Sequence, residues 1–152
     1  MALNSAGITA AVAALSVSGV SIKDTSAIPD KVLHRDCPIL FPVPGDWVGG
    51  AGGSPDDETT FGTPGTRYWQ VHRTFKYIYL HSAVGTGRGL ADEYNAIVTK
   101  AELIWEAITA LDVAGVDVEN ITHSAVGVLS DGAGNQFNGC MFEITVREKV
   151  NA

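Results

Sequence analysis

Residues 67–81 read RYWQVHRTFKYIYLH, the longest regular alternation of apolar and polar side chains in this chain. The large side chains of one parity are Trp69, Val71, Phe75, Tyr77 and Tyr79. The opposite parity carries Gln70, His72, Thr74 and Lys76. Because side chains of a strand point alternately to its two faces, this pattern predicts a long strand with one buried and one wet face.

A long helix is predicted after this strand, from Leu90 to Leu111. Its apolar positions fall on one stripe: Leu90, Tyr94, Ile97, Val98, Ala101, Ile104, Trp105, Ile108 and Leu111. Charged residues take the other side: Asp92, Glu93, Lys100, Glu102 and Glu106. The spacing is that of an amphipathic helix, and acids in its first turn suit the helix dipole.

The remaining segments complete one α+β domain spanning residues 1–152. A short helix is expected around Ile8 to Leu15, and brief strands at Val20–Lys23 and Cys37–Phe41. Ile121–Leu129 and Phe137–Val150 predict an antiparallel hairpin. The order of elements favours a mainly antiparallel sheet of about four to five strands, with one long and one short helix on one face.

Residues 42–66 form a Gly/Pro-rich stretch with seven Gly, four Pro and no Lys or Arg. A loop of about 25 residues is unusual inside a compact domain and is commonly functional or disordered. Trp47 and Phe61 are aromatic residues that a solvated linker does not need. We therefore predict an extended loop that acts as an assembly arm.

Composition limits the classes of function. The chain has 152 residues and a formal net charge of −7, which argues against general nucleic-acid binding. The apolar run Ile8–Val20 is not preceded by Lys or Arg and is too short to cross a membrane, so synthesis and retention in a cytoplasm are expected. Cys37 and Cys140 are interpreted as free thiols, with one disulfide left open.

No cofactor, metal or catalytic site is predicted. The run Gly85-Thr-Gly-Arg-Gly89 lacks the spacing of a dinucleotide loop, and the four histidines lack metal-ligand spacing. Cys37 near His34 leaves a small cysteine-dependent enzyme as an alternative.

Charge is divided along the sequence. Residues 90–119 hold seven acids against Lys100 alone, whereas basic residues lie on the long strand. This division suits head-to-tail packing of identical subunits into a ring, with ordinary surface charge as the alternative. The predicted contact residues are two aromatic anchors and acids that meet basic groups of a neighbour: Trp47, Phe61, Asp56, Asp57, Glu58, Arg67, Arg73 and Arg88.

The layout resembles the small tail-completion proteins of long-tailed bacteriophages, and most of all the tail-terminator group. The resemblance rests on an N-terminal helix, the glycine-rich arm and five short stretches: Ile28–Asp30, Arg35–Pro38, Leu40–Pro42, Leu80–Gly85 and Asp131–Cys140. It implies a hexameric ring in the neck of the virion that caps the tail tube, contacts the tail-tube protein and the head-side neck or connector protein, and lets DNA pass through. A head-side stopper, a tail-tube subunit and a capsid-decorating protein remain alternatives.

Overall fold

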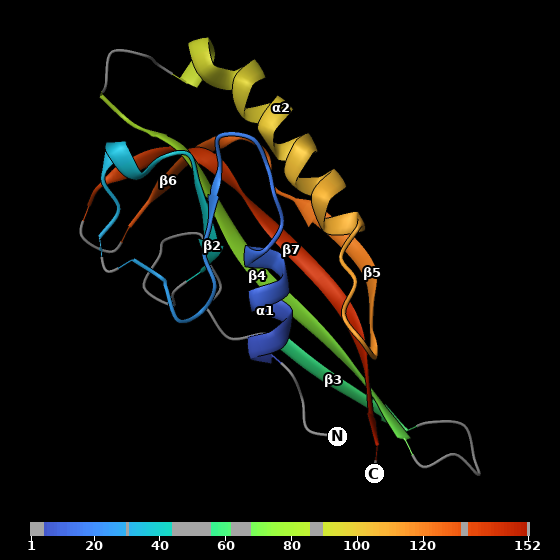
Figure 1. The fold of residues 1–152 in the computed structure, drawn as a ribbon. Coiled ribbons are helices and arrows are strands. Elements are labelled where there is room, and N and C mark those ends of the chain that lie inside the picture. Colours follow the sequence, from blue (N-terminus) through green and yellow to red (C-terminus); the bar gives the residue numbers. More distant parts are fainter. Residues whose placement is uncertain are drawn as a thin grey trace.

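The computed structural model describes residues 5–29, 31–43, 56–61, 68–85, 90–131 and 134–151. It has an α+β fold, as predicted, in which two helices lie against a strongly elongated sheet (Figure 1). The elements in chain order are α1 (Ser5–Ala13), β1 (Ser21–Ile22), the 3-10 helix η1 (His34–Asp36), β2 (Ile39–Pro42), β3 (Asp56–Phe61), β4 (Tyr68–Ala83), α2 (Leu90–Thr109), β5 (Val116–His123), β6 (Gly127–Ser130) and β7 (Gln136–Asn151).

The centre of the sheet is the antiparallel pair of β4 and β7, each sixteen residues long. The path through the sheet is β1-β2-β4-β7-β5, with β3 also pairing to β4 and β6 to β7. Only the β1–β2 pair is parallel among the described strand pairs. The described sheet therefore has seven strands, more than the four to five predicted.

The predicted single strand Ile121–Leu129 is wrong, because the structure divides this region between β5 and β6. Both pair antiparallel with β7, and residues 124–126 lie between them. Within this gap, Ser124 forms two hydrogen bonds with the backbone of Met141 on β7. Its N–H donates to the Met141 carbonyl at 2.8 Å, and its Oγ accepts from the Met141 N–H at 2.9 Å. The Ser124 hydroxyl thus accepts the hydrogen bond that a backbone carbonyl would accept in a regular strand pair.

The larger core lies between the sheet and the two helices. The helices contribute buried Ile8, Val12, Ile97 and Ile104, and these pack on buried β4 and β7 side chains of one parity. The strand residues are Phe75, Tyr77, Tyr79, Cys140, Phe142, Ile144 and Val146. The predicted placement of both helices on one face of the sheet is confirmed.

A second core on the opposite face was not predicted. The segment around Val32 packs against Phe41, Ile78, Leu80 and Phe137, all buried. Ile78 and Leu80 have the parity that the sequence analysis assigned to the wet face. The prediction fails at this end of β4 because a connecting segment covers the face there, which the alternation alone does not reveal.

The side of α2 that faces the sheet differs from the predicted stripe. Tyr94 and Trp105, expected inside, are 48% and 43% exposed. Glu93, expected outside, is buried and accepts a hydrogen bond from Ser82 Oγ, which in turn accepts one from Asn138 Nδ2 at 3.3 Å. The start of α2 is therefore fixed to β4 and β7 by a polar cluster, because a buried carboxylate needs donors.

Among the described residues, neither helix has the length and apolar character needed to cross a membrane.

Candidate assembly surfaces

Part of the predicted loop 42–66 is a strand. Asp56–Phe61 forms β3 and pairs antiparallel with β4, so the prediction of an irregular arm is wrong for these six residues. Asp57 is the Cα partner of Arg73, Glu58 that of His72 and Phe61 that of Trp69. Predicted acidic and basic contact residues therefore adjoin within one subunit. β3 is a strand despite its polar sequence because its backbone pairs with the edge of β4, and this pairing does not require β3 to have an apolar face of its own.

We call β3, with 69–74 of β4 and 145–150 of β7, the sheet extension. β3 and β7 lie on the two sides of this part of β4. The sheet continues here past α1, toward the lower right of Figure 1. The extension gives the molecule a projecting end made of paired strands.

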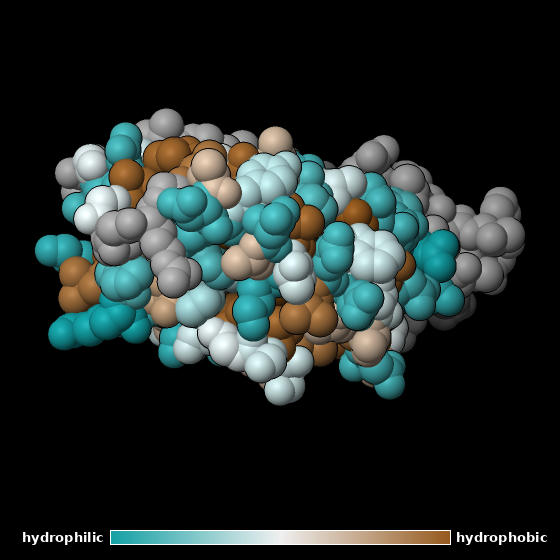
Figure 2. Space-filling model, turned by 90° about the horizontal axis from the view of Figure 1, so that it is seen from above, coloured by the Kyte–Doolittle hydropathy of each residue, from teal (hydrophilic) through white to brown (hydrophobic). Residues whose placement is uncertain are grey.

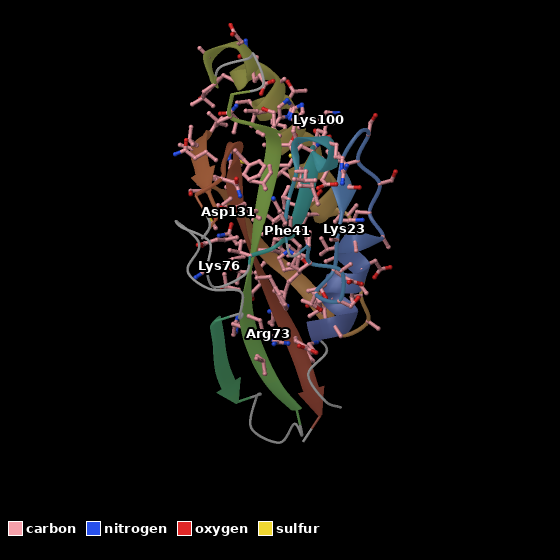
Figure 3. The ribbon with its side chains drawn as sticks, turned by 90° about the vertical axis from the view of Figure 1, so that its left-hand side faces the viewer. Lys23, Phe41, Arg73, Lys76, Lys100 and Asp131 are labelled. Atoms are coloured by element: carbon pink, nitrogen blue, oxygen red, sulfur yellow. The ribbon has the colours of Figure 1, made fainter. Side chains whose placement is uncertain are left out.

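Arg73 was predicted to meet the acids of a neighbouring subunit, and this prediction is wrong. Its side chain is buried, and Nη1 lies 3.5 Å from Oε2 of Glu148, which is also buried. The guanidinium also lies over the ring of Phe75, 5.3 Å from its centroid. Figure 3 shows Arg73 and Lys76 on opposite sides of β4. Arg73 belongs to the fold, where burial requires a paired charge.

The sheet face opposite the helices carries a polar ladder at the sheet extension. His72 Nδ1 lies 2.9 Å from Oε2 of Glu119, and Arg147 Nη2 donates to Oδ2 of Asp117 at 2.9 Å. Both pairs are partly exposed to solvent, so each contributes modestly to stability. This face matches the wet side that the alternation in β4 predicted.

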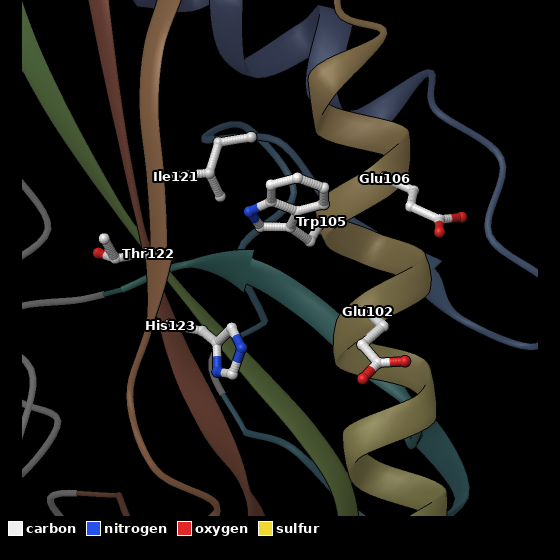
Figure 4. A pocket seen from close by; sticks show the side chains of 6 residues that line it. All are labelled: Glu102, Trp105, Glu106, Ile121, Thr122 and His123. Atoms are coloured by element: carbon white, nitrogen blue, oxygen red, sulfur yellow. The ribbon is translucent and has the colours of Figure 1, made fainter.

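A groove runs between α2 and β5. Trp105 extends from α2 toward β5 beside Ile121, and His123 extends from β5 toward α2 (Figure 4). The groove has a volume of about 530 Å³, and Glu102, Glu106 and Thr122 complete its lining. A smaller hollow of about 230 Å³ adjoins it along Trp105 and Ile121. We call the two together the Trp105 groove.

Sequence reasoning missed the Trp105 groove because helical spacing places Trp105 beside Ile104 and Ile108 without showing whether a strand covers it. Exposed large apolar residues also occur elsewhere on α2, at Tyr94 and Leu103. Seen from above, hydrophobic side chains reach the visible surface in separate patches among hydrophilic ones (Figure 2). Half-exposed Trp is enriched where proteins meet, which makes Trp105 an interface candidate.

His34 begins η1 and Cys37 follows its last residue, and the two do not form an activated pair. Cys37 Sγ donates to the Leu33 carbonyl at 3.8 Å, and His34 Nδ1 accepts from the Ala83 N–H at 3.3 Å. Burial, and then the charge of Asp36, raise the pKa of the Cys37 thiol to about 11. A nucleophilic cysteine needs a lowered pKa, so the geometry opposes the enzyme alternative.

Thiol labelling tests this directly. Cys37 and Cys140 are free, and burial raises the pKa of Cys140 to about 12. Because the thiolate is the reactive form, iodoacetamide should label the folded protein at pH 7 at least about ten-fold more slowly than the unfolded protein. The rate at Cys37 should rise as the pH approaches 11, measured by intact mass. Rapid stoichiometric labelling of Cys37 at pH 7 would contradict the assignment.

Three predicted contact residues, Trp47, Arg67 and Arg88, lie outside the described residues, as do the side chains of Asp56, Asp57, Glu58 and Phe61. Across the described chain, no group of three or more His, Cys, Asp or Glu side chains is placed to hold a metal ion. Comparison of the sequence with models of known protein families and with curated proteins finds no match.

Proposed function

We propose that this chain is a structural subunit of a tailed-bacteriophage virion, and that it forms the tail-terminator ring that caps the tail tube and joins it to the head-side neck. The observation that carries the proposal is the sheet extension. It is a projection built from three paired strands that extends past α1 (Figure 1). Such a projection is suited to lie on a neighbouring subunit.

Three further features support this function. The sequence layout resembles that of tail-completion proteins, as described above. The exposed side of α2 carries Asp92, Glu102 and Glu106, and an acidic ring wall would let DNA pass without binding it. The Trp105 groove offers a second, unlike surface for contact, as a head-to-tail ring requires.

The first test is the mass of the purified protein by light scattering, with negative-stain images of the same sample. We expect a ring of about six subunits. The protein is then mixed with tail tubes and capsids of the same phage. Binding at one end of the tube supports the terminator. Binding along the tube or over the capsid would instead favour a tail-tube or decorating role, and binding to neither would refute a virion role.

The sheet extension is tested by the double variant Thr59→Pro/Thr60→Pro. Consecutive residues of a strand direct their N–H groups to opposite sides, so either Thr59 or Thr60 donates toward β4. Replacing both with proline therefore removes that donor in either case. The body should stay folded, as judged by circular dichroism, while ring formation and tube binding are lost. Thr59→Ala/Thr60→Ala keeps both N–H groups and should assemble normally. Assembly of the proline variant at wild-type concentration would show that the extension is not a contact surface.

A further inference from the structure

The Trp105 groove has the chemistry of a receptor for a cationic side chain. Trp105 is 43% exposed, and its indole ring forms the apolar part of the groove beside Ile121. An indole face attracts guanidinium and ammonium groups through its quadrupole, and Arg stacks on it most readily. The site therefore favours an Arg-bearing partner over a purely apolar one.

The charge around Trp105 favours the same kind of partner. Residues 101–123 contain five acids and no Lys or Arg; two of the acids, Asp117 and Glu119, pair with Arg147 and His72, which leaves Glu102 and Glu106 as the acids on the α2 side of the groove. Glu102 and Glu106 also line the groove, although their side chains project from α2 away from the indole ring (Figure 4), and neither forms an ion pair with another described residue. Two carboxylates with no ion-pair partner among the described residues, lining the same groove as an exposed indole ring, give the groove a preference for a cationic partner.

The opposite edge of the molecule offers a matching element. Arg35 lies on η1, and both Arg35 and Lys31 are exposed. The Leu33 N–H donates to Oδ2 of Asp36 at 2.8 Å, and the Asp36 N–H donates to the Leu33 carbonyl at 2.9 Å. His34 is held to the end of β4 through Ala83. Arg35 is therefore presented on a fixed turn, at low entropic cost of ordering on binding.

The two elements lie on opposite sides of the molecule. In Figure 1, η1 is the short cyan helix at the upper left, whereas α2 and β5 lie on the right. The strand order agrees, because β1 and β5 end the path through the sheet. Unlike, complementary surfaces on opposite sides of one subunit produce head-to-tail contacts that close into a ring when the rotation permits.

We propose that the Trp105 groove binds η1 of a second copy of this chain, with Arg35 stacked on the Trp105 indole and attracted by the negative charge of Glu102 and Glu106. The proposal rests on the proposed ring and names its subunit contact. It assigns a role to four side chains that the fold itself leaves exposed.

Charge reversal tests the pairing. Arg35→Glu alone, or Glu102→Arg/Glu106→Arg alone, should weaken self-association at least about 100-fold, as expected for a central charged contact. An equimolar mixture of the two variant proteins should assemble again, because each interface then joins opposite charges. Glu143→Lys is the control, because Glu143 is exposed on β7 outside both the sheet extension and the Trp105 groove, and this variant should assemble as wild type. A mixture that stays monomeric would overturn the pairing.

The indole contact is tested separately with Trp105→Ala. We expect it to weaken assembly at least about ten-fold, measured by sedimentation, with an unchanged thermal unfolding midpoint. Leu103→Ala is a matched control, because Leu103 is 40% exposed on the same helix but does not line the Trp105 groove. Equal assembly of Trp105→Ala and wild type would refute the contact.

The two proposals can fail separately. A wild-type ring that survives both Arg35→Glu and Trp105→Ala ends the contact proposal and leaves the terminator function standing. A wild-type protein that remains monomeric at millimolar concentration would also refute the contact proposal. Binding of that monomer to tube ends would still support the terminator function. Loss of tube binding together with a ring that obeys the charge reversals would refute the function and keep the contact.

Discussion

Gly139→Ala should destabilise the protein more than any other single methyl addition at the described glycines. Gly139 lies on β7, and a Cβ there would overlap the Tyr79 carbonyl oxygen of β4 and lie 3.0 Å from its carbonyl carbon. These are backbone atoms of the neighbouring strand, so no side chain can rotate away. We expect a loss of at least about 3 kcal/mol, at the upper end of the range for overpacking.

Thermal unfolding measures this effect. For a domain of this size, the expected loss lowers the midpoint by about 10 °C. Gly127→Ala is the control, because Gly127 is the Cα partner of Gly139 in the β6–β7 pair and a Cβ there meets no atom within 4 Å. It should change the free energy of unfolding by less than about 1 kcal/mol. Equal effects of the two variants would contradict the close approach of β4 and β7.

Arg73→Met should cost about 3–5 kcal/mol of the free energy of unfolding. It keeps most of the side-chain volume but leaves the carboxylate of Glu148 buried without its main charged partner. The double variant Arg73→Met/Glu148→Met should recover most of that loss, because it removes both buried charges. Urea unfolding of the single and double variants gives the coupling energy.

The exposed ion pair next to it provides the comparison. Arg147 and Asp117 lie closer together, at 2.9 Å against 3.5 Å, but both are partly exposed. Asp117→Asn should therefore cost less than about 1 kcal/mol, because solvent screens the charge. If Asp117→Asn lowered the free energy of unfolding as much as Arg73→Met, burial would not explain the contribution of the Arg73–Glu148 pair to stability.

Local patterns in the sequence were enough to predict the main elements. Alternation over 67–81 located β4, and helical spacing after Leu90 located α2, because each pattern depends only on the element itself. The buried parity of β4 near Phe75 followed in the same way. The α+β class then followed from the order of elements along the chain.

What the sequence did not reveal depends on partners far away along the chain. Arg73 shares the inward parity of Phe75, but its partner Glu148 lies 75 residues later. β3 has no apolar alternation, so only its pairing to β4 identifies it as a strand. The exposure of Trp105 depends on how far β5 covers α2. The Trp105 groove was therefore not predicted, although the helix that carries Trp105 was.

The long β4–β7 pair also has a consequence for how the protein is made. Apart from His81, at a register shift, every residue of β4 pairs with a residue of β7 more than 50 positions later in the chain. Domains dominated by such distant contacts fold slowly. During synthesis, β4 leaves the ribosome well before β7 exists, and its apolar side chains and unpaired backbone can meet other nascent chains. Yield should therefore depend on slow translation and on chaperones that shield β4 until β7 arrives.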